Sequence, residues 1–126
     1  MKIMIVDDCN TTRKLLGHYL RSREYSVGFA ENGLDALEKL ATNDVNLIMT
    51  DLNMPYMDGI ELIKTLRSNP ELSEIPILMV TTENDDIEKE KAIRSGADGY
   101  MIKPVTGDAI AENIKSIVKQ IFTKGG

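Results

Sequence analysis

The clearest structural signal in this sequence is the run Val45-Asn46-Leu47-Ile48-Met49-Thr50-Asp51-Leu52-Asn53-Met54-Pro55-Tyr56-Met57-Asp58-Gly59. Its first half is short and mostly apolar, a pattern typical of a strand that helices cover on both faces of a parallel sheet. The apolar run ends at Asp51, and residues that favour turns follow it. A carboxylate is therefore expected where a central strand leaves the sheet, at the edge where α/β proteins bind their ligands. Taken alone, the pattern equally fits an aspartate that starts a turn or caps the next helix.

The rest of the chain alternates in the same way between strand and helix patterns. Besides the opening stretch, β-rich runs predict strands at residues 3–6, 26–30, 75–80 and 99–102. Apolar residues at helical spacing predict helices at 10–23, 36–41, 60–66, 87–95 and 110–121, the first of them capped by Asn10, Thr11 or Thr12. Five alternations predict a single-domain α/β fold with a five-stranded parallel sheet and right-handed crossovers.

The composition is that of one globular domain. Of the 126 residues, 42% are hydrophobic and 28% are charged, and we expect residues 1–126 to form a single domain with no output domain. The formal net charge of −5 gives no broad basic surface, so we expect no nucleic-acid binding. Cys9 is the only cysteine, which excludes an internal disulfide. No apolar run reaches the roughly 20 residues of a membrane span and no signal peptide is recognisable, so we expect a cytoplasmic protein without membrane contact.

Polar side chains stand at the ends of four of the five predicted strands. Asp7 and Asp8 follow the first strand, Asp51 the third, Thr81 the fourth and Lys103 the fifth. The carboxyl ends of parallel strands share one edge of the sheet, so these groups are expected to converge there. Each has an ordinary explanation, such as a helix cap or a solvated lysine, and it is their combination at one edge that indicates a site.

The predicted cluster has the chemistry of a phosphoryl-binding site. Three neighbouring carboxylates repel one another unless a cation lies between them, and oxygen ligands favour Mg²⁺. Lys103 adds a positive charge and Thr81 a hydroxyl donor around Asp51. Asp51 is then the candidate nucleophile, which becomes an aspartyl-phosphate.

Four segments of the chain form one combined motif: Ile5-Val6-Asp7-Asp8, Thr50-Asp51-Leu52-Asn53-Met54-Pro55 with Met57-Asp58-Gly59, Val80-Thr81, and Gly96-Ala97-Asp98-Gly99-Tyr100 through Lys103-Pro104. With this motif the chain resembles the response-regulator receiver domains of bacterial two-component signalling, and among them the stand-alone, CheY-like receivers. The resemblance covers essentially the whole chain. It implies a doubly wound, flavodoxin-like parallel sheet with the strand order 2-1-3-4-5.

The resemblance also implies a metal site. Asp51 matches the phosphoacceptor, and Asp8 and Asp51 match direct ligands of the Mg²⁺ ion. Asp7 matches a ligand that acts largely through water. Asn53 matches the residue whose backbone carbonyl completes the metal shell.

The remaining implied roles concern the switch and its decay. Thr81 matches the hydroxyl that moves to the phosphoryl group, Lys103 the lysine that pairs with a phosphoryl oxygen, and Tyr100 the aromatic residue that rotates on phosphorylation. Pro104 matches the proline that follows a cis peptide bond. The rate of self-hydrolysis is expected to depend on Asn53, Glu83 and Thr82.

The function implied is that of a stand-alone response regulator. A sensor histidine kinase would supply the phosphoryl group, and the face formed by the fourth helix, fifth strand and fifth helix would bind a target protein, a phosphatase or a second copy of the chain. The resemblance favours chemotaxis, with a phosphorelay intermediate as the alternative. The chain is not expected to be an enzyme beyond its own phosphorylation and dephosphorylation. An aspartate-nucleophile phosphatase needs a second aspartate two positions after the nucleophile, where this chain has Asn53.

Two further features remain open at the level of sequence. His18 is the only histidine, and we interpret it as a solvated side chain of the first helix. Met54, Tyr56 and Met57 lie in the loop after Asp51, where a contact with the kinase or the phosphatase is as plausible as a purely local role.

Overall fold

The chain folds into five strands that alternate with five helices, as the sequence predicts. The computed structural model describes the backbone of residues 1–125 and the side chains of residues 1–121. The elements are β1 (Lys2–Val6), α1 (Asn10–Arg21), β2 (Ser26–Ala30), α2 (Gly33–Leu40), β3 (Leu47–Thr50), α3 (Gly59–Ser68), β4 (Ile77–Thr81), α4 (Asp86–Ser95), β5 (Gly99–Ile102) and α5 (Gly107–Gly125). Only the boundaries differ from expectation. The largest differences are in the helices: α2 begins three residues before Ala36, and α5 begins three residues before Ile110 and ends four residues after Ile121.

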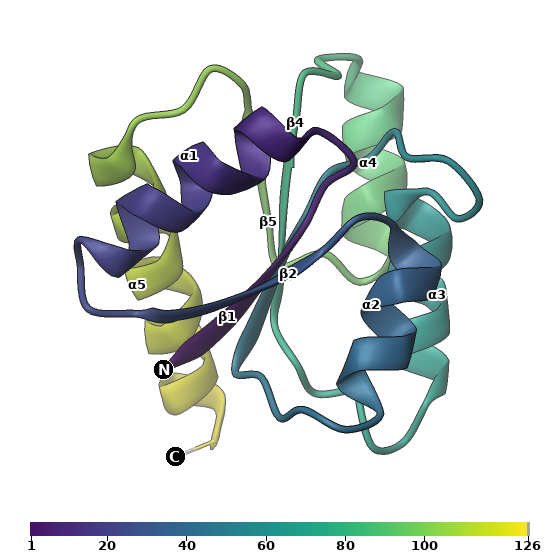
Figure 1. Ribbon diagram of the computed structural model, residues 1–126. Helices are drawn as coiled ribbons and strands as arrows, with labels where there is room; N and C mark the ends of the chain where they lie inside the picture. The colour runs from purple at the N-terminus through teal and green to yellow at the C-terminus, as the bar shows by residue number, and fades with distance from the viewer. Residues whose placement is uncertain (126) are drawn as a thin grey trace.

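The strands form one parallel sheet in the order β2-β1-β3-β4-β5, which confirms the predicted fold class and strand order. Figure 1 shows the sheet between two helical layers, with α1 and α5 on one face and α2, α3 and α4 on the other. All five strands run in the same direction, so their carboxyl ends meet at one edge, which we call the carboxyl edge. The opposite edge, where the strands begin, is the amino edge.

Each face of the sheet has its own hydrophobic core, because side chains of a strand alternate between the two faces. In β1, Met4 and Val6 pack under α2, α3 and α4, whereas Ile3 and Ile5 pack under α1 and α5. Burying an aliphatic side chain of this size stabilises the fold by roughly 2 kcal/mol. The strands that carry the functional candidates are therefore held firmly from both sides.

Side-chain caps fix where most of the helices begin. Asn32 caps α2 by accepting from the backbone N–H of Asp35, and Asp58 forms a capping box with Glu61 at the start of α3. The predicted cap of α1 is wrong. Asn10 is already the first helical residue, and the N-cap residue is Cys9, whose side chain makes no capping hydrogen bond.

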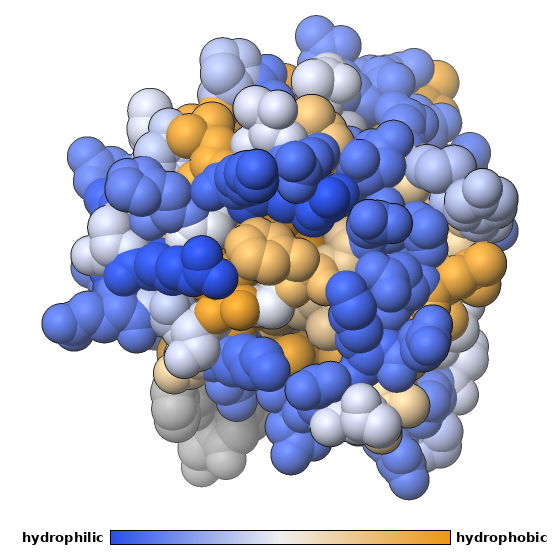
Figure 2. Space-filling model, viewed as in Figure 1, coloured by the Kyte–Doolittle hydropathy of each residue, from blue (hydrophilic) through white to orange (hydrophobic). Residues whose placement is uncertain are grey.

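One face of the molecule exposes the edge strand β2. Figure 2 shows mostly hydrophilic side chains there, with a small apolar area between α1 and α2. The β2 residues Val27 and Phe29 are only partly buried. Within residues 1–125, none of the helices has the length and apolar composition that crossing a bilayer requires.

Candidate functional site

Three aspartates meet at the carboxyl edge. Asp7 directly follows β1 and is only 2% exposed, Asp8 comes next and is exposed, and Asp51 follows β3 and is half-buried. One carboxylate oxygen of each lies within 4.8 Å of the others. Three hard oxygen donors at this separation suit a divalent cation such as Mg²⁺, which takes few protein ligands and keeps several waters.

The backbone around Asp51 is held by short local contacts. The N–H of Asp51 donates to the carbonyl of Val6 at 2.9 Å, which extends the pairing of β3 with β1 by one residue. Asp51 Oδ1 accepts from the N–H of Leu52 at 2.7 Å, which helps to fix the orientation of the carboxylate. Gly59 packs against the carbonyl oxygen of Asp51 so closely that a Cβ atom would overlap it. A glycine at this position therefore lets α3 begin directly beneath the site.

Lys103 links two of the carboxylates. Its Nζ donates to Asp7 Oδ2 at 2.8 Å and to Asp51 Oδ2 at 3.4 Å. Burial lowers the pKa of Lys103, but the hydrogen bond to Asp7 and the charges of Asp51 and Asp7 outweigh this effect and raise the pKa above its ordinary value of 10.5. The lysine is therefore protonated at neutral pH. With all three carboxylates ionised, two negative charges remain uncompensated, which favours a divalent cation.

A second set of contacts connects Thr81 to Tyr100 through the backbone of Glu83. Thr81 ends β4 and is fully buried, and its Oγ1 accepts from the N–H of Glu83 at 3.3 Å. The carbonyl of Glu83 in turn accepts from the hydroxyl of Tyr100 at 2.7 Å. Burial, together with nearby acidic side chains led by Glu83, raises the pKa of Tyr100, so its hydroxyl keeps the proton that it donates.

The other predicted residues lie in the loops of the same edge. Asn53 and Thr82 are exposed, and the peptide bond between Lys103 and Pro104 is cis. Tyr56 has a φ of 69° and an exposed fraction of 83%. Met57 instead packs against Gly33, at the start of α2. These residues lie in the segments that follow β3, β4 and β5, and the roles assigned to them stay predictions.

The sequence analysis assigned no role to two residues of the site. Arg13 donates from Nη1 to the backbone carbonyl of Asp7 at 2.6 Å, and Thr50 donates from Oγ1 to the carbonyl of Asp51 at 2.9 Å. Thr50 carried a signal, because it is a polar residue inside an otherwise apolar strand. Nothing in the sequence marked Arg13 as part of the site, because an arginine in an amphipathic helix is usually solvated.

Comparison with known proteins agrees with this geometry. The family model for the response regulator receiver domain matches residues 3–115. Chemotaxis protein CheY1 of Helicobacter pylori is 38% identical over 120 residues, which cover 94% of this chain and 97% of that protein. Chemotaxis protein CheY-3 of Vibrio cholerae is 37% identical over 122 residues, covering 96% of this chain and 94% of that protein.

Solved structures lead to the same family. Chemotaxis protein CheY4 of Vibrio cholerae has a TM-score of 0.87 and 32% identity, with 92% of this chain and 97% of that chain covered. A putative response regulator from Chloroflexus aurantiacus has a TM-score of 0.89 and 31% identity, with 94% and 97% covered. These similarities, over almost the whole length of each protein, agree with the three aspartates and the lysine at the carboxyl edge. The chain therefore belongs to the response regulator receiver domain family, with chemotaxis proteins of the CheY type among its relatives.

Proposed function

We propose that the protein is a stand-alone chemotaxis response regulator, which accepts a phosphoryl group on Asp51 from a sensor histidine kinase. The observation that carries this proposal is the arrangement of Asp51 among Asp7, Asp8 and Lys103. The full-length match to CheY-type relatives supports the assignment to chemotaxis.

In the proposed reaction, an oxygen of the Asp51 carboxylate attacks the phosphorus of a phosphohistidine. The P–N bond breaks as the P–O bond forms, and the histidine nitrogen leaves as imidazole after taking up a proton from water. In the later hydrolysis, a water oxygen attacks the phosphorus, the bond to Asp51 breaks, and inorganic phosphate is released. Each step is a substitution at phosphorus and needs no oxidant or reductant.

Different residues of the chain would bind the metal ion, pair with the phosphoryl group and position Asp51. Asp7, Asp8, Asp51 and the backbone carbonyl of Asn53 would hold Mg²⁺, which offsets the charge of the transferring phosphoryl group when bound. Lys103, already protonated and within 3.4 Å of Asp51, would pair with a phosphoryl oxygen. The backbone contacts of Asp51 keep its carboxylate in place throughout.

We propose that the signal leaves the site through Thr81, Glu83 and Tyr100. A phosphoryl oxygen on Asp51 would attract the Thr81 hydroxyl and compete with its weak 3.3 Å contact to the Glu83 N–H. The Glu83 backbone would then shift, and with it the carbonyl that holds the Tyr100 hydroxyl. Tyr100 would rotate, changing the surface formed by α4, β5 and α5, where a target protein, a phosphatase or a second copy would bind.

The first experiment measures the intact mass after incubation with acetyl phosphate and Mg²⁺. The wild type should gain the mass of one phosphoryl group, and Asp51→Asn should gain none. Asp44→Asn is the matched control, because Asp44 is exposed and lies outside the site. Labelling of Asp51→Asn equal to that of the wild type would disprove the phosphoacceptor assignment.

The second experiment tests the route through Tyr100, using backbone amide shifts with and without a stable phosphoryl mimic. Tyr100→Phe removes only the hydroxyl that bonds Glu83, and Tyr100→Ala removes the ring as well. Both variants should bind the mimic, and their shift changes on α4 and α5 should fall, most strongly for Tyr100→Ala. Shift changes equal to those of the wild type in both variants would exclude Tyr100 from the switch.

A further inference from the structure

Two neighbouring helices end in the same short motif. α3 ends in Lys64-Thr65-Leu66-Arg67-Ser68, and α4 ends in Lys91-Ala92-Ile93-Arg94-Ser95. Both helices cover the same face of the sheet and run from its carboxyl edge to its amino edge (Figure 1). Their last turns therefore lie next to each other, with the lysine, arginine and serine of one motif opposite those of the other.

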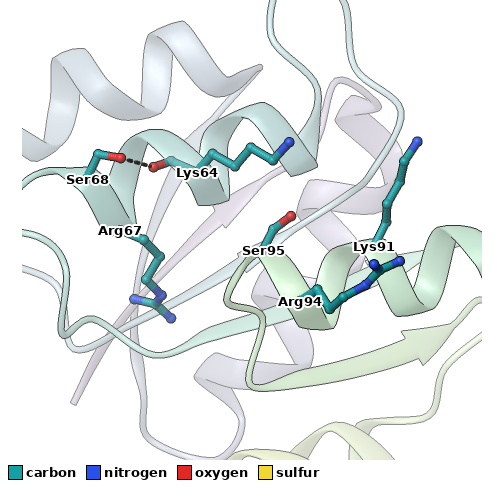
Figure 3. A pocket seen from close by; sticks show the side chains of 6 residues that line it. All are labelled: Lys64, Arg67, Ser68, Lys91, Arg94 and Ser95. Carbon is teal, nitrogen blue, oxygen red and sulfur yellow. Dashed lines mark hydrogen bonds between the residues drawn. The ribbon is translucent and has the colours of Figure 1, made fainter.

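The space between the two motifs is an open groove of about 680 Å³. Figure 3 shows the six side chains that line it, three from each helix: Lys64, Arg67, Ser68, Lys91, Arg94 and Ser95. The lining contains no acidic residue, although the chain as a whole has 20 acidic against 15 basic residues. A concentration of positive charge on an acidic protein is a feature that a partner can recognise by charge complementarity.

Most of this positive charge is not firmly paired within the protein. The Arg94 side chain is 70% exposed and lies 3.9 Å from Glu90, and Lys91 lies 3.5 Å from Glu88. Exposed pairs of this kind contribute little stability and rearrange readily. Among the side chains that the structure describes, no acidic group lies within ion-pair distance of Lys64, and the Ser95 hydroxyl has no hydrogen-bond partner. Arg67 differs, because its guanidinium is engaged at the base of the groove.

The cations are spread along the groove and do not converge. In Figure 3, the Lys64 and Lys91 side chains extend away from the groove's base, Arg94 extends along α4, and Arg67 turns down below α3. A single phosphate group would need cations that surround one point. An extended segment with several carboxylates would meet them one after another, and the free Ser95 hydroxyl adds a hydrogen-bond donor.

We propose that this α3–α4 groove is a docking surface for an acidic segment of a partner protein. This docking role goes beyond the proposed phosphoryl-transfer function, because the groove lies at the ends of α3 and α4 that are remote from Asp51. Binding there would be independent of phosphorylation, so one molecule of the regulator would stay attached to its partner in both signalling states.

The test uses the full chain and a fluorescein-labelled peptide of alternating Glu and Gly residues, followed by anisotropy at low ionic strength. Lys64→Glu combined with Lys91→Glu should raise the Kd about tenfold, since two of the four positive charges that line the groove are reversed. Lys14→Glu combined with Lys115→Glu is the matched control, because both lysines are exposed and lie outside the groove, and its Kd should change by no more than about twofold. Asp51→Asn should bind like the wild type.

Amide shifts measured with the unlabelled peptide should change at the last turns of α3 and α4. Four results would each overturn the proposal. These are no binding by the wild type, equal weakening in the control pair, shift changes confined to other helices, and displacement of the peptide by an equal concentration of inorganic phosphate. The first would mean that the cations act only on the helix ends, where they offset the helix dipoles.

Discussion

Each edge of the sheet contains one partly buried basic side chain, Lys103 at the carboxyl edge and Arg67 at the amino edge, and the two are bound by different kinds of acceptor. At the carboxyl edge, Lys103 is held by the side-chain carboxylates of Asp7 and Asp51. At the amino edge, Arg67 donates mainly to the backbone, and its acceptors are the carbonyls of Ser73, Ile75 and Gly96 and the carboxylate of Asp98.

The difference separates a cation placed among reactive groups from a cation that holds segments of the fold together. Backbone carbonyls are neutral and fixed, so the contacts of Arg67 connect α3 to the segments before β4 and β5 and leave little to change. The carboxylates around Lys103 outnumber it and retain negative charge that a metal ion and a phosphoryl group can use. The type of acceptor, and not the presence of a partly buried cation, distinguishes the edge that can carry out phosphoryl chemistry.

The largest expected effect is at the carboxyl edge. Asp8→Ala should lower Mg²⁺-dependent labelling by acetyl phosphate about 100-fold, because a direct metal ligand is lost. The melting temperature should stay the same or rise, since one of three like charges is gone. Labelling and thermal unfolding measured on the same sample check both parts, and normal labelling would refute the metal assignment.

Removing the Arg67 side chain at the amino edge should lower stability and leave labelling unchanged, the reverse of the result expected for Asp8→Ala. Arg67→Ala should lower the free energy of unfolding by about 3 kcal/mol, because several carbonyls lose their donor together. Labelling of the folded fraction should stay at the wild-type level. Arg94→Ala is the control from the same groove and should cost no more than about 0.5 kcal/mol. Urea unfolding curves give both values, and a stability loss below that of Arg94→Ala would contradict the role of Arg67.

Lys103→Ala tests whether the cation at the carboxyl edge is used for signalling. Metal binding should be unchanged or slightly tighter, since a neighbouring positive charge is removed. The gain in partner affinity on phosphorylation should be lost, because the phosphoryl oxygen has no ion pair. A titration of the partner with and without phosphoryl mimic measures this gain. If the variant gains affinity as the wild type does, Lys103 does not transmit the signal.

A smaller effect is expected at the entrance of the site. Thr82 is exposed next to Thr81, where it would narrow the path of the attacking water. Thr82→Ala should therefore speed phosphate loss roughly threefold, which corresponds to about 0.7 kcal/mol in the barrier. The decay of labelled protein after removal of the phosphodonor gives the rate. An equal or slower decay would show that Thr82 does not restrict access.

An effect of similar size to that of Thr82→Ala is expected for Asp35, an acidic residue near the carboxyl edge whose hydrogen bonds stabilise the fold. The hydrogen bond from the Glu31 N–H lowers its pKa below 3.8 against the opposing effect of burial, with Lys39 contributing further. Because the folded pKa is the lower one, its stabilisation is present above pH 3.8 and is lost as pH falls through the folded value. Asp35→Asn should cost about 1 kcal/mol at pH 7 and progressively less below pH 3.8. An equal cost at all pH values would refute the charge argument.

The sequence predicted the elements well because their signals are local. Periodic apolar residues and glycines located most helix and strand ends, and Gly96, with a φ of 123°, ends α4 as expected. The start of α1 was misassigned because three capping residues stand in a row and the N-cap residue is the cysteine before them.

The burial of side chains in α4 follows the sequence pattern only in part. Ala92 is buried as its spacing suggests, but Ile87 and Ile93 are 66% and 45% exposed. Lys91, Glu112 and Lys119 are exposed, as an output surface containing them requires, although Lys91 also lines the groove with α3.

The sequence by itself determined which groups meet at the carboxyl edge. Parallel strands end at one edge whatever the details of packing, so Asp7, Asp51 and Lys103 had to converge once the strands were recognised. Only the tertiary structure decided the contacts made through backbone atoms, such as the link from Thr81 to Tyr100 across Glu83. The same holds for Arg67 and its carbonyl acceptors. Every residue carries a carbonyl and nearly every residue an N–H, so the sequence does not mark which of them a side chain will reach.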